Sequence, residues 1–140
     1  MQSAIENNVI VVRADDGEDL FAAISSALDA HGAKSAIVLS GIGMLDDFEL
    51  GYFNGKDYMN EFFPKPRELV GLHGSVTTDE DRKVIHLHAA LAGEDHKVVG
   101  GHLQRALVCV VCEITMLKIE KIDMSREMDS RSGLKLLRVR

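Results

Sequence analysis

Apolar and polar positions alternate along most of the chain in a way that predicts strands, with one clear helix near the start. A strand is expected from Asn8 to Arg13 (NVIVVR), and a second from Lys34 to Ser40 (KSAIVLS). Between them, Asp16 can cap the start of a helix and Gly32 can stop it. The apolar positions that recur at helical spacing are Leu20, Phe21, Ile24, Ala27 and Leu28. The order strand, helix, strand predicts a parallel pair of strands joined by a right-handed crossover.

The rest of the chain alternates strand-like segments with turn residues. A G-x-G motif over residues 41–43 follows the second strand. Because the third glycine of a phosphate-binding loop is missing, we expect a tight turn at the end of the strand. Further strands are predicted for the segment FELGYF and for Arg67 to Val76, Val84 to Ala92 and Ala106 to Ile122. We therefore predict a single domain over residues 1–140 with an α+β fold.

The segment HLHAALAGEDHKVVGGHL holds an H-x-H pair followed by a G-G-H motif. On a strand, His86 and His88 lie two residues apart, so both imidazoles leave the same face. The turn residues around Asp95 predict a hairpin that brings His102 opposite His88. Because cross-strand side chains on one face lie about 5 Å apart, the three rings are expected to meet.

Three imidazoles at this spacing suit one divalent transition metal, zinc above all. With no fourth protein ligand, a position stays open for water or substrate, as in a catalytic zinc site. His73 or an acidic residue such as Glu113 is the alternative that would close the site. Glu113 is also the one candidate for a catalytic acid or base, against the alternative of an exposed surface glutamate. The competing interpretation of the histidines is that each is a half-buried side chain held by hydrogen bonds, without a metal.

The net charge of −6 disfavours nucleic acid as a partner, because binding to phosphates depends on clustered Lys and Arg. The best basic cluster lies in the C-terminal tail, where interspersed acidic residues predict a solvated surface. Its members are Arg126, Arg131, Lys135, Arg138 and Arg140.

The location and redox state are inferred from the N-terminus, the apolar runs and the cysteines. The polar start from Met1 to Asn8 does not resemble a signal peptide, and the apolar run from Ala106 to Cys112 is too short to span a membrane. We therefore expect a cytoplasmic protein with no membrane partner. Cys109 and Cys112 form a C-x-x-C on a predicted strand, where we expect buried, unreactive thiols rather than a redox pair.

The histidine motifs belong to a longer series of short motifs. In order, the chain contains G-x-G, Leu50-Gly51-Tyr52, Glu68-Leu69, His86-Leu87-His88-Ala89 and Gly100-Gly101-His102-Leu103. This series resembles the plants and prokaryotes conserved domain, over a core of about residues 9–122, with 123–140 as a C-terminal extension. The resemblance implies a mixed, strongly twisted sheet with one or two packing helices and assembly as a homotrimer. It also implies a metal held by His86, His88 and His102.

The resemblance leaves two classes of function open. Plant members follow DNA-binding AT-hooks, but this chain has no hook and is acidic, so we do not expect direct DNA binding. The first hypothesis is a metal-binding regulatory domain that recognises a small molecule or partner protein, and the absence of an assignable general base favours it. The second is a zinc-dependent lyase or hydrolase acting on a small carbonyl or ester substrate. Its basis is that the histidine pattern also resembles the zinc ligands of acetolactate decarboxylase.

Overall fold

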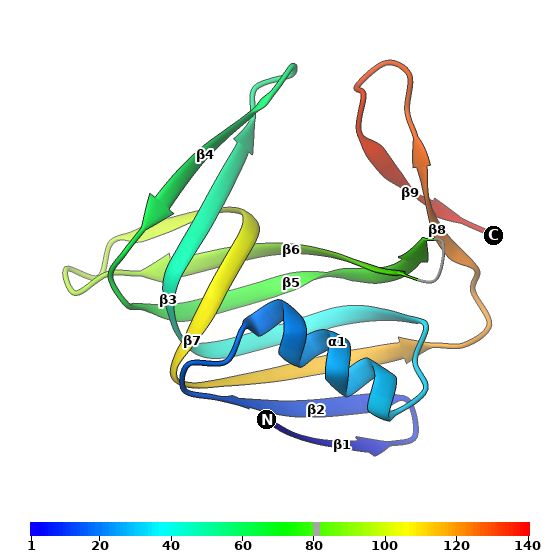
Figure 1. Cartoon of the computed structure of the whole chain (residues 1–140), viewed down its shortest axis with the longest axis horizontal. Helices are drawn as coiled ribbons and strands as arrows, with labels where there is room; N and C mark the ends of the chain where they lie inside the picture. The colour runs from blue at the N-terminus through cyan, green and yellow to red at the C-terminus, as the bar shows by residue number, and fades with distance from the viewer. Residues whose placement is uncertain (80–81) are drawn as a thin grey trace.

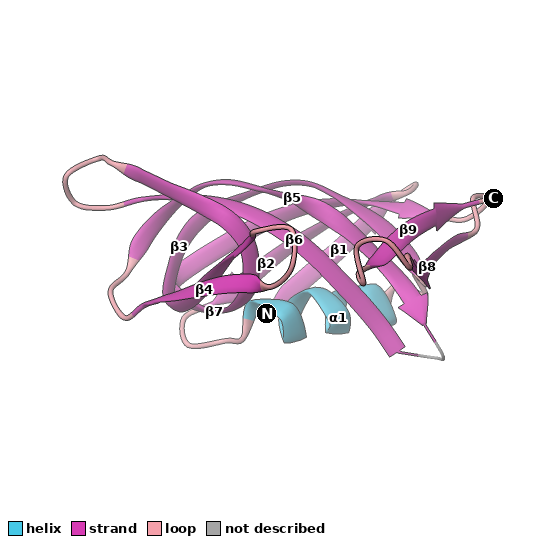
Figure 2. Cartoon of the chain, turned by 90° about the horizontal axis from the view of Figure 1, so that it is seen from above, coloured by secondary structure: helices cyan, strands magenta, loops and turns pink. Residues whose placement is uncertain are grey.

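Strands dominate the structure, a computed structural model that describes residues 1–79 and 82–140. Within these residues, seven strands form one twisted sheet in the order β1-β2-β7-β6-β5-β3-β4, and β8 and β9 form a separate pair (Figures 1 and 2). The strands are β1 (Gln2–Glu6), β2 (Val9–Asp15), β3 (Ser35–Phe53), β4 (Tyr58–Phe63), β5 (Arg67–Asp79), β6 (Arg82–Ala92), β7 (Val98–Ile119), β8 (Met124–Met128) and β9 (Lys135–Val139). One helix, α1 (Leu20–Ala30), occurs in the described ranges.

Helix α1 packs its apolar side against β2 and β7 (Figure 1). Its buried residues recur at helical spacing and are Leu20, Ala23, Ile24, Ala27 and Leu28. On β2, Ile10, Val12 and Ala14 are buried while the residues between them are exposed. The period of two on the strand and the longer period on the helix thus bury two matching apolar surfaces against each other.

The helix begins later than the sequence predicts. Asp19, not Asp16, is the N-cap, and its carboxylate accepts a hydrogen bond of 2.8 Å from the backbone N–H of Ala22. Asp16 instead accepts a hydrogen bond of 2.7 Å from the N–H of Val110, so it ties the loop before the helix to β7. The predicted stop is confirmed, since Gly32 follows the helix with a φ of 59°.

The two longest strands bend, and each pairs with three neighbours. β3 pairs with β4, β5 and β7, while β7 pairs with β2, β3 and β6. The G-x-G motif lies inside β3, so the prediction of a turn at a strand end is wrong. Gly43 has a φ of 138°, and a Cβ there would lie 2.2 Å from the carbonyl oxygen of Val111. The glycine therefore permits close contact between β3 and β7 at a shift in their register.

The predicted α+β class and mixed sheet are wrong. All strand pairings between the described elements are antiparallel, and the fold is mostly β with a single described helix. β2 and β3 were expected to pair in parallel across the helix, but both pair antiparallel with β7, which lies between them. The connection through α1 makes β3 run in the same direction as β2. The strand that lies between them, β7, comes from a distant part of the chain.

The C-terminal residues form a hairpin that leaves the main sheet. β8 pairs with β9, and the hairpin projects from the body of the molecule, coloured orange to red in Figure 1. It contacts β5 through β8, where Met124 is buried. None of the helical structure in the described ranges is both long enough and apolar enough to cross a membrane.

Candidate metal centre

Two neighbouring strands carry the three candidate ligands on one face of the sheet. His86 and His88 lie on β6, and the alternate residues Leu87 and Ala89 are buried in the core. β6 is joined to β7 by a hairpin, in which His88 and His102 form a direct cross-strand pair. The register predicted from the turn residues is therefore confirmed.

The three imidazoles converge on one point. Their potential ligand atoms, one from each ring, all lie within 4.8 Å of one another, and the ring centroids are 4.9 to 5.4 Å apart. Nitrogens at about 2.0–2.1 Å from a tetrahedral zinc stand roughly 3.3–3.4 Å from one another, so ring movements of about 1 Å would bring these atoms to ligand geometry. Among the described residues no cysteine or carboxylate joins the group.

Burial favours the neutral form of His86 and His102, and the neutral ring is the form of histidine that binds metals. Burial lowers the pKa of His86 to about 4, with smaller effects from the charges of His102, Arg126 and His88. Burial likewise lowers the pKa of His102. The Nδ1 atom of His102 is buried and has no hydrogen-bond partner among the described residues. Because buried polar atoms are normally paired, this nitrogen fits the role of a metal ligand.

The two glycines before His102 allow close backbone contacts. A Cβ at Gly101 would lie 2.9 Å from the carbonyl oxygen of Gly51 on β3. A Cβ at Gly100 would lie 3.0 Å from the carbonyl oxygen of Ala89 on β6. Side chains at these positions would push β7 away from its neighbours and move His102 with it.

The other two candidates lie outside the group. His73 on β5 is the cross-strand partner of His88, but its Nδ1 lies 2.9 Å from the carbonyl oxygen of Leu39. Glu113 is exposed on the C-terminal part of β7, where its backbone lies opposite that of Arg13 on β2. It belongs neither to the histidine group nor to the lining of the cavity beside it. Glu113 is therefore not positioned to act as an acid or base at this site.

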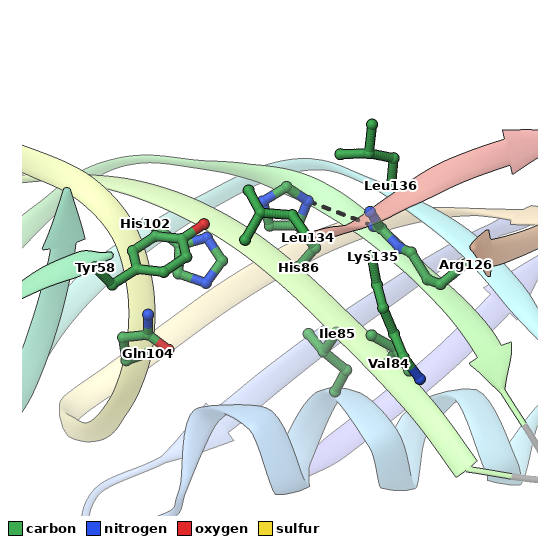
Figure 3. Close-up of a pocket in the computed structure, with 10 residues that line it drawn as sticks. All are labelled: Tyr58, Val84, Ile85, His86, His102, Gln104, Arg126, Leu134, Lys135 and Leu136. Carbon is green, nitrogen blue, oxygen red and sulfur yellow. Dashed lines mark hydrogen bonds between the residues drawn. The ribbon is translucent and has the colours of Figure 1, made fainter. Parts of the chain in front are cut away.

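A cavity of about 360 Å³ opens beside His86 and His102 (Figure 3). From the main sheet it is lined by Tyr58, whose ring centroid lies 5.1 Å from that of His102. From the C-terminal hairpin it is lined by Arg126, whose Nη2 donates a hydrogen bond of 2.9 Å to Ser75 Oγ. The same Nη2 lies 3.4 Å from Nδ1 of His86. Arg126, the phenol of Tyr58 and two imidazoles thus line one small space.

Most residues that line this cavity were not predicted from the sequence. Arg126 was predicted to belong to a solvated basic tail, but it is half-buried against the sheet. Tyr58 comes from β4, on the far side of β3, and carries no local signal of its role. Gln104, which also lines the cavity, could have been found, because it follows His102 by two residues on one strand and so leaves the same face.

Comparison with known proteins shows the family. The model of the Plants and Prokaryotes Conserved (PCC) domain matches residues 1–120, and the chain belongs to this family. The resemblance recognised from the histidine and glycine motifs is thereby confirmed. A search among curated proteins finds no match to the chain.

Solved structures with the same fold cover almost the whole chain. A plant- and prokaryote-conserved protein of Pyrococcus horikoshii is 28% identical, with a TM-score of 0.85 over 98% of this chain and 94% of that one. A metal-containing protein of Archaeoglobus fulgidus is 30% identical, with a TM-score of 0.84 over 96% of this chain and 95% of that one. A protein of Bacteroides thetaiotaomicron, provisionally described as DNA-binding, is 22% identical, with a TM-score of 0.89 over 98% and 96%, and shares the fold.

Proposed function

We propose that this chain binds one divalent transition metal, zinc in the first place, through His86, His88 and His102. The observation that carries the proposal is the convergence of three potential ligand atoms within 4.8 Å of one another. Nδ1 of His102 is buried and has no hydrogen-bond partner among the described residues, which supports the proposal. Imidazole suits zinc, copper, iron and nickel, so the ligand set alone does not select one of them. The metal-containing relative from Archaeoglobus fulgidus supports the same proposal.

Metal content of the purified protein tests this proposal, with His88→Ala beside His73→Ala as a matched control. Both histidines are exposed and face each other on neighbouring strands, but only His88 belongs to the group. Mass spectrometry should find near-stoichiometric metal in the native protein and in His73→Ala, and a large loss in His88→Ala. A native protein that takes up no added zinc, or equal retention of metal in the two variants, would contradict the proposal.

We further propose that the metal serves recognition of a small molecule or a partner protein, in a regulatory role. A bound zinc supplies a Lewis acid with an open coordination position. Around it the chain provides the hydrogen-bonding groups of Tyr58 and Gln104 and the positive charge of Arg126. In the part of the chain that the structure describes, no carboxylate lines this cavity that would act as a general base. The residues present therefore fit binding better than turnover.

A zinc-dependent lyase or hydrolase acting on a small carbonyl or ester substrate is the second candidate. The observation that favours it is the phenol of Tyr58 beside a three-histidine group, because a zinc site with three protein ligands keeps a position for substrate or water. Turnover of a panel of esters and keto acids, abolished both by a chelator and by His88→Ala, would support an enzyme. Absence of any metal-dependent turnover across the panel would exclude this candidate for those substrates.

We also propose that the chain assembles as a homotrimer in the cytoplasm. The face of the sheet opposite α1 supports assembly, since Val9, Val11 and Ile42 are 39%, 53% and 54% exposed there. Light scattering should give a mass three times that of one chain, and Val11→Glu should lower this mass, whereas a native monomer would refute the trimer.

The free thiols of Cys109 and Cys112 fit a reducing compartment such as the cytoplasm, and cell fractionation tests that location.

A further inference from the structure

The cavity beside the histidines contains a positive charge that lacks an acidic partner among the described residues. Arg126 forms none of the ion pairs found there, and its Nε atom is buried without a hydrogen-bond partner. The other cation of the lining, Lys135, lies 2.5 Å from the carboxylate of Asp79. Arg138, on the same hairpin, pairs with Glu127. A half-buried charge is costly unless an opposite charge compensates it, so a bound anion would be stabilised by Arg126.

The remaining walls of the cavity are largely apolar. Val84 and Ile85 come from β6, and Leu134 and Leu136 from the C-terminal hairpin. All four line the same cavity as His86 and Arg126, and Figure 3 shows the two leucines among its lining residues. The volume of about 360 Å³ lies at the lower end of the range of about 300–1,000 Å³ that holds small organic ligands.

The tautomer of His86 connects this cavity to the metal centre. Arg126 Nη2 lies 3.4 Å from His86 Nδ1, and it can donate a hydrogen bond there only when Nδ1 carries a lone pair instead of the ring proton. When His86 gives a nitrogen lone pair to a metal, Nδ1 either is that ligand atom or carries the ring proton. In both cases Nδ1 has no lone pair left for Arg126. The N–H of Arg126 is then available to a bound anion, so metal and anion are expected to bind cooperatively.

We propose that the cavity binds a small organic carboxylate with an apolar tail, held at its carboxylate by Arg126 and at its tail by Leu134 and Leu136. A planar guanidinium matches a carboxylate in shape and charge. Inorganic phosphate fits less well, because it has no apolar part to pack against the four aliphatic side chains of the lining, Val84, Ile85, Leu134 and Leu136. The cooperative effect of the metal rests on the proposed function, whereas binding of the carboxylate itself does not.

Calorimetric titration of the full chain with phenylacetate tests the proposal, in the metal-free and the zinc-loaded forms. Phenylacetamide serves as the neutral control, because it has nearly the same shape without the charge. We expect saturable binding of phenylacetate, at least about tenfold tighter than that of the amide and tighter than that of inorganic phosphate. Equal binding of the amide, preference for phosphate, or no saturable binding of phenylacetate to either form would overturn the proposal.

Two pairs of variants locate the site. Arg126→Met should weaken phenylacetate binding at least about tenfold, while Arg138→Met removes a charge from the same hairpin and should leave binding unchanged. Should Arg126→Met fail to fold, Leu136→Glu places a repelling carboxylate at a position that is 45% exposed. Its control is Leu137→Glu, at the neighbouring position, which is 42% exposed and does not line the cavity. Equal affinities within either pair would overturn the proposed site.

The two proposals fail in distinguishable ways. A chain that takes up no zinc but binds phenylacetate through Arg126 would refute the metal centre and support the carboxylate site. A chain that takes up zinc through its histidines but binds phenylacetate in neither form would refute the carboxylate site alone. Zinc uptake that leaves the affinity for phenylacetate unchanged would overturn the cooperative link through His86.

Discussion

Replacement of Gly74 by alanine should damage the sheet next to the histidine group, while the same change at Gly71 should not. A Cβ at position 74 would lie 2.0 Å from the carbonyl oxygen of His86, whereas ordinary contacts begin at 3.4 Å. β5 and β6 would therefore have to separate locally by about 1.4 Å. At Gly71, on the same strand, the nearest atom to a Cβ would be Nε2 of His73 at 3.8 Å, so a methyl group fits there.

The expected difference in stability follows from these distances. A flexible side chain could absorb a few tenths of an ångström, but here the obstacle is backbone, so Gly74→Ala should cost about 3 kcal/mol or more of the free energy of unfolding. For a chain of this length that corresponds to a fall of roughly 10 °C in Tm. Gly71→Ala restricts only the unfolded chain, and should be neutral or stabilise the protein by up to about 1 kcal/mol.

Urea denaturation with a chelator present measures this difference without a contribution from bound metal. Zinc binding of the folded variants provides a second result. Displacement of the His86 carbonyl should shift the imidazole as well, so Gly74→Ala should bind zinc more weakly than Gly71→Ala. Equal unfolding midpoints for the two variants would refute the inferred close contact between β5 and β6.

Four further predictions concern single groups. In the metal-free protein the pKa of His86 should be about 4, below its ordinary value of 6.5. Between these two pH values the unfolded chain binds more protons than the folded one. The free energy of unfolding should therefore decrease as the pH falls from 6.5 to 4. A midpoint near 6.5 in an NMR titration of the ring would contradict this. Asp19→Ala should cost about 1 kcal/mol through loss of the helix cap, and an unchanged urea midpoint would contradict that role. Burial raises the pKa of the Cys112 thiol to about 12, so iodoacetamide at pH 8 should label it only after unfolding, and rapid labelling of the native protein would contradict its burial. With a net charge of −6, the protein should not retard duplex DNA on a gel at physiological salt, and a retarded band would reverse our expectation.

The parts of the site that could be predicted are close together in the chain. His86, His88 and His102 lie on two strands joined by a short turn, so the period of two and the hairpin register were sufficient to bring them together. Gly101 differs, because its close contact is with Gly51 on β3, a strand outside this hairpin. Arg126 could not be placed, since its position depends on the packing of the C-terminal hairpin against β5.

The sequence by itself determined the local elements: the alternation of buried and exposed residues on β2 and β6, the helix that ends before Gly32, and the meeting of three imidazoles across one hairpin. Only the tertiary structure decided that β7 lies between β2 and β3, and that β3 continues through Gly43 instead of turning there. The reason is that strand pairing over long sequence separations depends on which surfaces are buried together. Many pairings satisfy the same pattern of apolar residues, and nothing in a short segment distinguishes between them.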